Sequence, residues 1–235
     1  MRRFAAPILL TTTLATTPAS AAAVSALLAA VAANGHFAIP TRADVTIERR
    51  QDEHVTIGTA VLVGRGQTLY VETRDGTRAL VRPSKIVVRE HGRAVRARPG
   101  ARLGATDVLL EDLVPVGPWI MKVPQVSDEG PMGTVVTGAP AIASVRVLVV
   151  LTIDPEAHAV TRTKYYEKSI SDLAAFRRDE DFAEVDGHTR PTRITIDRTR
   201  DETATTLGLV WRAAPQTSRD LFTLRGLRAP SPIAW

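Results

Sequence analysis

The 235-residue sequence contains no cysteine. This absence excludes disulfide bonds, thiolate metal sites and a cysteine nucleophile. It also excludes an N-terminal cysteine that could be acylated, so the protein is not itself a lipoprotein. Aromatic residues make up only 5% of the chain. Any apolar interior therefore has to be built mainly from valine, leucine, isoleucine and alanine.

Lysine is also scarce, so the formal charge of +5 comes almost entirely from arginine. The arginines are spread through alternating segments and are not gathered in a block. A nucleic-acid groove requires clustered basic residues and stacking aromatic side chains. The sequence shows neither feature, so we expect no nucleic-acid partner.

Known catalytic and cofactor-binding motifs are absent as well. There is no Gly-x-Ser-x-Gly elbow, no His-Glu-x-x-His pair and no glycine loop for a phosphate or a dinucleotide. The five histidines, His36, His54, His91, His158 and His188, do not pair at metal-ligand spacing. We therefore expect a protein that is not an enzyme and that uses no metal or cofactor.

One carboxylate pair leaves an alternative open. Asp107 and Glu111 are four residues apart and would share a helix face, where with one histidine they could serve a hydrolase of the cell envelope. The favoured interpretation is that Asp107 caps a helix and Glu111 is exposed. The acidic run 179–181 is expected to be solvated.

The N-terminus has the features of a secretory signal peptide. Arg2 and Arg3 precede a moderately apolar stretch, and Ala19-Ser20-Ala21 is a small-residue cleavage signal. We expect cleavage near Ala21 or Ala23, with residues 1–23 as the signal, and an exported protein that works in the periplasm or another extracytoplasmic space. The stretch 24–33 either extends the signal or forms the first helix of the mature domain.

Beyond residue 34 the pattern predicts a single mainly β domain, 34–228, followed by a Pro-rich tail, 229–235. Short runs alternate between apolar and polar residues, with turn signals about every ten residues, as in antiparallel sheets. The dipeptides Asp75-Gly76 and Asp186-Gly187 predict hairpin turns.

Two stretches depart from this alternation. Within residues 99–118, the apolar residues from Val108 to Leu113 predict a short helix with Thr106 or Asp107 as its N-cap. Residues 122–142 are rich in proline, glycine, serine and aspartate, so we expect a long loop there.

Several strands are apolar on both faces and need a cover on each side. A curved sheet with an aliphatic concave face and short helices over it would form a lipid site. Apolarity on both faces does not decide which face lies inside. One of the two alternating sets of residues in each strand has to be assigned to the inner face. With this assignment, the expected cavity lining is Val61, Leu69, Val71, Val147, Val149, Leu151, Tyr165, Ile194, Ile196, Leu207 and Leu209. The expected lid residues are Val108, Leu109 and Leu113.

Three segments carry a family resemblance. DFAEVDGHTRPTRITIDRTRDETATTLGLVWR (181–212), RDLFTLRGL (219–227) and ARLGATDVLLEDL (101–113) resemble parts of the outer-membrane lipoprotein-sorting family, the Lol-type periplasmic carriers. Shared features are a Val-Asp-Gly turn, a Pro-x-x-Ile strand and a Gly-(Ser/Thr)-Asp…Glu-Asp-Leu segment, in the same order. The likeness covers residues 101–227 well and residues 36–99 weakly.

The resemblance implies an unclosed β-barrel of about eleven antiparallel strands with short helices over its concave face. It implies a non-catalytic carrier of lipid or acylated protein, with an inner-membrane transporter or a membrane-anchored regulator as a further partner. We expect a monomer. An envelope-stress or lipid sensor of the same fold is the alternative within the family.

Overall fold

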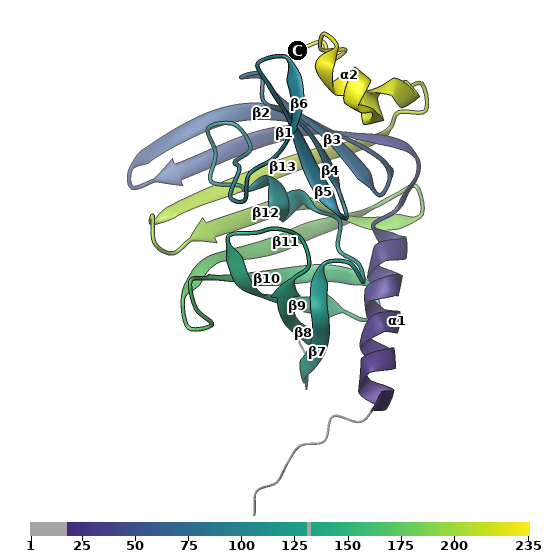
Figure 1. Ribbon diagram of the computed structural model, residues 1–235, viewed down its shortest axis with the longest axis vertical. Coiled ribbons are helices and arrows are strands. Elements are labelled where there is room, and N and C mark those ends of the chain that lie inside the picture. Colours follow the sequence, from purple (N-terminus) through teal and green to yellow (C-terminus); the bar gives the residue numbers. More distant parts are fainter. Residues whose placement is uncertain (1–17, 131–132) are drawn as a thin grey trace, which may run out of the picture.

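The computed structural model describes residues 18–130 and 133–235 and shows one sheet of 13 antiparallel strands (Figure 1). The strands are β1 (Phe37–Gln51), β2 (His54–Gly66), β3 (Thr68–Thr73), β4 (Arg78–Arg82), β5 (Lys85–Glu90), β6 (Arg93–Arg96), β7 (Met121–Gly130), β8 (Gly133–Pro140), β9 (Arg146–Asp154), β10 (Ala159–Glu167), β11 (Leu173–Val185), β12 (His188–Arg198) and β13 (Thr203–Ala213).

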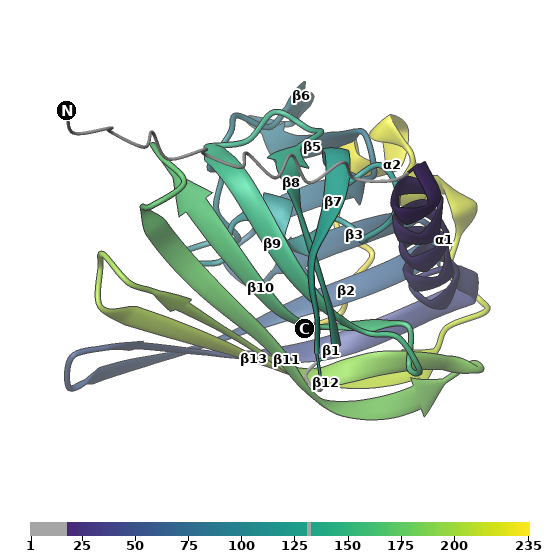
Figure 2. The same ribbon diagram turned by 90° about the horizontal axis from the view of Figure 1, so that it is seen from below.

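The sheet consists of two meanders, β1–β6 and β7–β13, which are joined because β1 pairs with β13. Strands β6 and β7 are its two edges, so the sheet curves around a concave face and does not close (Figure 2). The expected mainly β, unclosed half-barrel is confirmed, with two strands more than the eleven expected.

Helices are few and short apart from the first. They are α1 (Pro18–Asn34), the 3-10 helices η1 (Leu110–Leu113) and η2 (Arg219–Phe222), and α2 (Leu224–Arg228). The chain leaves β6 at one edge of the sheet and enters β7 at the other. Residues 97–120, here called the crossing segment, make this connection over the concave face and carry η1.

The long loop expected at 122–142 is wrong, because these residues form the hairpin of β7 and β8. Proline is tolerated in an edge strand or at a bulge, where its missing N–H removes no ladder hydrogen bond. Pro124 lies in edge strand β7, where the register with β8 shifts between Lys122 and Gln125. The proline- and glycine-rich composition that predicted a loop therefore belongs to an irregular edge hairpin of the sheet.

Both Asp-Gly hairpin turns are found. Asp186 and Gly187 have φ angles of 53° and 74°, the left-handed pair typical of a tight turn between β11 and β12. Gly76, with φ of 95°, lies in the turn that joins β3 to β4.

The sheet has an apolar core on each face, which explains why its strands are apolar on both sides. The larger core lies on the concave side and includes α1 and the crossing segment. The smaller core lies on the other face of β2–β5, where Leu221, Phe222 and Leu227 of η2 and α2 cover Tyr70 and Leu80. The C-terminal element thus supplies the second cover.

A β-bulge in β9 changes which residues face inward. Tyr166 pairs with Leu148 and Glu167 pairs with Arg146, so Val147 is an extra residue opposite the β10 strand. An extra residue shifts the alternation by one position. Arg146 is therefore buried while Val147 is 41% exposed, although simple alternation puts Val147 on the face of Val149.

Helix α1 belongs to the packed domain over most of its length. Val24, Leu28 and Val31 lie four and three residues apart and are buried in the concave core, as expected of one helix face. At its end, the Asn34 side chain donates to the carbonyl oxygens of His158 (3.1 Å) and Thr189 (3.2 Å) and accepts the Thr189 N–H (2.9 Å).

Residues 24–33 therefore belong to the first helix of the packed domain. The signal peptide and its cleavage site stay predictions. Its charged start and apolar stretch fall within residues 1–17, outside the described residues. No helix in residues 18–130 and 133–235 is both long enough and apolar enough to span a membrane.

Candidate functional site

The crossing segment forms a tighter helix than expected. η1 has only four residues, and the residue before it is Leu109, so the N-cap expected at Thr106 or Asp107 is wrong. Thr106 is used in the preceding turn, where its hydroxyl donates to the Leu103 carbonyl at 2.7 Å. The Leu109 N–H donates a hydrogen bond to the carboxylate of Asp112 at 2.7 Å. The helix start is therefore capped by a side chain from within η1.

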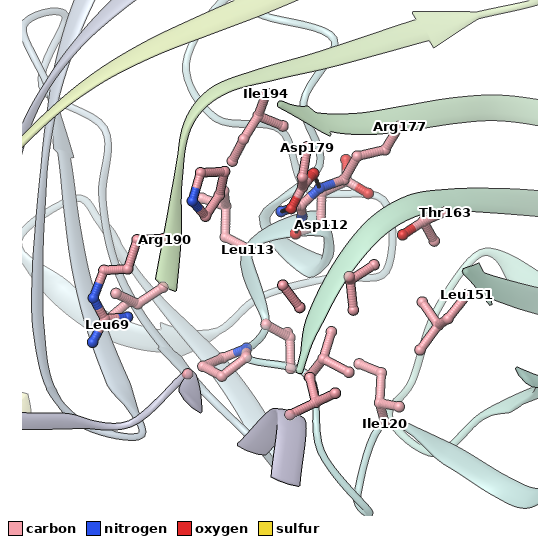
Figure 3. Close-up of a pocket in the computed structure, with 18 of the residues that line it drawn as sticks. Leu69, Asp112, Leu113, Ile120, Leu151, Thr163, Arg177, Asp179, Arg190 and Ile194 are labelled. Atoms are coloured by element: carbon pink, nitrogen blue, oxygen red, sulfur yellow. Dashed lines mark hydrogen bonds and ion pairs between the residues drawn. The ribbon is translucent and has the colours of Figure 1, made fainter. Parts of the chain in front are cut away.

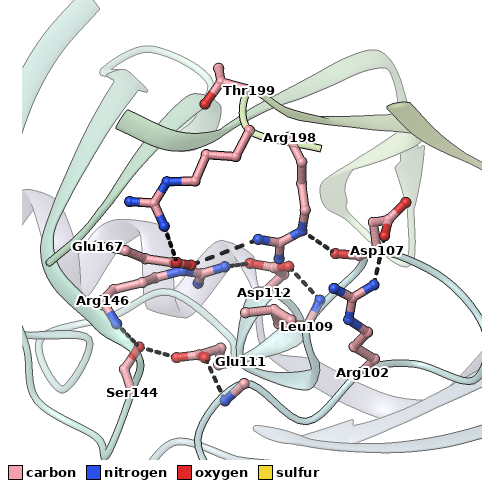
Figure 4. A network of polar contacts seen from close by, with 12 residues as sticks. Arg102, Asp107, Leu109, Glu111, Asp112, Ser144, Arg146, Glu167, Arg198 and Thr199 are labelled. Carbon is pink, nitrogen blue, oxygen red and sulfur yellow. Dashed lines mark hydrogen bonds and ion pairs between the residues drawn. The ribbon is translucent and has the colours of Figure 1, made fainter. Parts of the chain in front are cut away.

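Asp107 is a buried anchor of this segment. Its carboxylate accepts hydrogen bonds from Arg49 of β1 and from Arg102, both at 2.7 Å. Its carbonyl oxygen accepts the Nε–H of Arg198 of β12 at 2.7 Å (Figure 4). Burial opposes ionisation of Asp107, but the hydrogen bond and the charge of Arg49 outweigh it and lower its pKa.

Asp112 is the second anchor and pairs with the inward-facing Arg146 (Figure 4). Both side chains are almost fully buried, with exposed fractions of 0% and 3%. The Arg146 guanidinium lies 3.4 Å from the centre of the Tyr165 ring, within the range of a cation–π interaction. Burial, followed by the charge of Asp112, raises the pKa of Tyr165 to about 12, so this phenol stays protonated at neutral pH.

Asp179 does not lie in a solvated charge run, as expected, but in the interior. Its carboxylate receives two hydrogen bonds from Arg177, at 2.5 and 2.7 Å, and Arg177 also donates to the Asp112 carbonyl oxygen. Burial raises the pKa of Asp179, and Arg177 opposes this effect. The alternation of β11 brings residues 177 and 179 to the same face of the sheet.

Glu111 is also buried, which corrects the expectation that it is exposed. It accepts the Gly100 N–H at 3.2 Å and the Ser144 hydroxyl. Asp107, Glu111 and Asp112 therefore tie the crossing segment to β1, to the residues before β9 and to β9 itself. No group of three or more acidic or histidine side chains among the described residues is placed to hold a metal ion.

Between the crossing segment and the concave face lies a cavity of about 190 Å³ (Figure 3). Aliphatic side chains from both sides form most of its wall. Figure 3 shows Asp112, Arg177 and Asp179 grouped at one side and Arg190 standing apart from them. The aliphatic wall includes Val31, Leu62, Leu69, Leu113, Val114, Val116, Ile120, Ile142, Val149, Leu151, Val160, Ile194 and Leu209.

The structure brings part of the expected lining together in this cavity. The residues that border it are Leu69, Val149, Leu151, Tyr165, Ile194 and Leu209, with Leu113 from the expected lid. Those buried in the protein but away from the cavity wall are Val71, Ile196, Leu207, Val108 and Leu109.

Two expected lining residues lie elsewhere. In β2 the neighbouring Leu62 borders the cavity, and Val61 is buried in the core on the opposite face. The phase chosen for this doubly apolar strand was therefore opposite to the real one. Val147 is turned outward by the bulge in β9.

Sequence reasoning missed four charged members of the cavity wall: Arg146, Arg177, Asp179 and Arg190. A signal existed for Arg177 and Asp179, which are spaced two residues apart in a strand. For Arg146 no signal existed, because local alternation places it on the outer face and only the bulge brings it inside.

Comparisons with known proteins bear on the fold. No family model and no curated protein matches the sequence. A DUF1329 family protein from Desulfovibrio piger is similar in structure, with a TM-score of 0.74 and 14% identity over 88% of this chain and 99% of that one. A putative outer membrane lipoprotein-sorting protein domain from Vibrio parahaemolyticus has a TM-score of 0.72 and 12% identity over 85% and 95% of the two chains.

A LolA superfamily protein from Nitrosomonas europaea gives a TM-score of 0.66 and 17% identity, over 85% of this chain and 97% of that one. The fold is that of the lipoprotein-sorting half-barrels. The resemblance drawn from the sequence is thus confirmed at the level of the fold, which is all that identities of this size show.

The buried pair of Asp112 and Arg146 provides a first test. Replacing Asp112 by alanine leaves the Arg146 charge buried and uncompensated, so we expect a loss of about 3–5 kcal/mol in the free energy of unfolding. Urea denaturation measures this loss. The matched control is Glu180→Ala, because Glu180 pairs with Arg193 at 3.3 Å on the surface. It should cost less than about 1 kcal/mol, and similar losses for both variants would contradict the anchoring role.

The pKa of Asp107 provides a second test. A carboxyl group whose pKa is lower in the folded than in the unfolded chain stabilises the fold above its ordinary pKa of 3.8. This stabilisation is lost as the pH falls through the lowered value. We expect Asp107→Asn to be about 1–3 kcal/mol less stable at pH 7 and to lose less further stability than the wild type below about pH 4. Urea midpoints at both pH values measure this, and parallel pH profiles would refute the assignment.

Proposed function

We propose that the protein is a non-catalytic carrier that holds acyl chains, of a lipid or of an acylated protein, in the cavity on its concave face. The observation that carries the proposal is the aliphatic wall of this cavity, built by the sheet on one side and by the anchored crossing segment on the other. Each CH₂ group of a chain buried there contributes ~0.8 kcal/mol. Such a site binds firmly without any reactive group.

In this proposal the chain acts outside the cytoplasm, as a monomer, after removal of its N-terminal segment. It receives or delivers its cargo at a membrane component, such as an inner-membrane transporter or a membrane-anchored regulator. The similar fold of a lipoprotein-sorting domain supports a lipid or an acylated protein as the cargo. Which lipid or protein it is has to be found by experiment.

A hydrolase based on Asp107 and Glu111 has less support. A general acid or base needs a carboxyl group that reaches the substrate. Asp107 is held by Arg49 and Arg102 and does not border the cavity. Glu111 does border it, but its two oxygens are engaged by Gly100 and Ser144.

Filling the cavity should reduce chain binding. Val160 of β10 borders the cavity and is half-buried, so Val160→Trp puts an indole where the chain would lie. Loss of apolar contact equal to that of two buried CH₂ groups costs ~1.6 kcal/mol. We therefore expect the neutral probe N-phenylnaphthylamine to bind to this variant at least about tenfold more weakly than to the wild type. Fluorescence titration gives both dissociation constants.

The matched control is Val210→Trp, because Val210 is 69% exposed on the face of β13 opposite the cavity-lining Leu209. It should bind the probe as the wild type does. Equal weakening by both substitutions, or no binding to the wild type, would argue against an acyl-chain site in this cavity.

A further inference from the structure

Arg190 is the one arginine of the cavity wall that lacks an acidic partner among the described side chains. Arg146 pairs with Asp112, and Arg177 pairs with Asp179. Arg190 has an exposed fraction of only 4%. A buried charge is normally paired with an opposite charge, so this unpaired guanidinium calls for an explanation.

The contacts of Arg190 hold its guanidinium in place and leave hydrogen-bond donors free. The guanidinium carbon lies 3.9 Å from the centre of the Phe37 ring and 5.7 Å from that of Trp211. One N–H donates to the carbonyl oxygen of His36 at 2.9 Å, and the Nε–H has no partner among the described residues. The two aromatic rings fix the group without using its N–H donors.

The surroundings of Arg190 leave its charge incompletely compensated. Asp186 attracts it without forming an ion pair, and the Asp186 carboxylate accepts the Thr41 hydroxyl at 2.9 Å. Burial lowers the pKa of Arg190 to about 10, so the group is still a cation at neutral pH. Burial and the charge of Arg190 also lower the pKa of the nearby His188.

We propose that Arg190 binds the anionic head group, a carboxylate or a phosphate, of an amphiphile whose chain lies along the aliphatic wall. This inference rests on the proposed carrier function and adds the chemical class of its cargo. A guanidinium presents parallel N–H donors that match two oxygens of a carboxylate or phosphate. Asp112, Arg177 and Asp179 stand away from Arg190 (Figure 3). Asp112 is paired with Arg146, and Arg177 is paired with Asp179, so the Arg190 side of the cavity is the one that favours an anion.

The test compares ligands with the same chain and different head groups. Dodecanoate, dodecyl phosphate and neutral dodecanol compete with N-phenylnaphthylamine for the wild-type chain at pH 7.5. We expect both anions to bind about 10- to 100-fold more tightly than dodecanol, as for a charge-assisted hydrogen-bonded pair. Arg190→Gln should reduce this preference to about threefold or less, whereas Arg190→Lys should keep part of it.

The matched control is Arg193→Gln, three residues along the same strand. The Arg193 side chain is 50% exposed and pairs with Glu180 and Asp181, so this variant loses the same charge from the outer surface. It should keep the full preference for the anions. Circular dichroism and thermal unfolding show whether each variant is folded.

Several results would overturn the proposal. Equal affinity of the wild type for dodecanol and dodecanoate would do so even if Arg190→Gln does not fold, and so would an anion preference that survives in a folded Arg190→Gln. In another outcome, inorganic phosphate alone raises the temperature of thermal unfolding of the wild type, while anionic amphiphiles bind no more tightly than dodecanol. That result would assign Arg190 to a free anion instead of a head group. If dodecanol also fails to displace the probe, the carrier function itself is wrong.

Discussion

Three buried carboxylates of the crossing segment, on Asp107, Glu111 and Asp112, hold the concave side of this protein in shape. The open sheet makes them necessary. Because β6 and β7 lie at opposite edges, the chain has to cross the concave face between them, and a crossing segment with polar backbone groups cannot be buried by apolar contacts alone. The carboxylates bind arginines, a serine and backbone N–H groups, so the segment is fixed at several points and leaves a cavity beneath it.

The charges of this interior are arranged unequally. Near the anchored segment, each cavity arginine has its own aspartate, and Tyr165 remains neutral. At Arg190 the compensation from the described part of the chain comes from two aromatic rings, one carbonyl oxygen and the field of Asp186. An amphiphile in the cavity would therefore have a preferred direction, with its anionic group at Arg190 and its chain along the aliphatic wall.

The sequence predicted the class of fold better than the site. Alternating apolar residues and Asp-Gly turns were enough for an antiparallel sheet, because these patterns depend on near neighbours. That the sheet stays open was implied only by the family resemblance. The cavity depends on longer-range facts. The bulge at Val147 turns this residue outward and brings Arg146 inward at the start of β9. Strand β2 is apolar on both faces, so Val61 and Leu62 could not be told apart from alternation alone.

The acidic residues illustrate the same limit. In the linear sequence Glu111 and Asp179 look like surface groups, and Asp107 looks like a helix cap. Ser144 and Arg49, which bind Glu111 and Asp107, lie in distant parts of the chain. Arg177, which binds Asp179, lies in a strand whose inner face was not known. The isolated Pro and Gly residues of 122–142 predicted a loop, because a sequence does not show that a strand lies at an edge where such residues are tolerated. Burial and partner choice followed only from the folded arrangement.

Native mass spectrometry tests the central claim, that the concave cavity holds an acyl chain, most directly. A chain that starts at Pro18, which retains α1 and its buried face, is purified from bacteria without detergent, and any bound mass is extracted with solvent. We predict a co-purifying amphiphile with an acyl chain, at lower occupancy in Val160→Trp than in Val210→Trp. A ligand-free mass for a folded wild-type chain that also takes up no added amphiphile would contradict the claim.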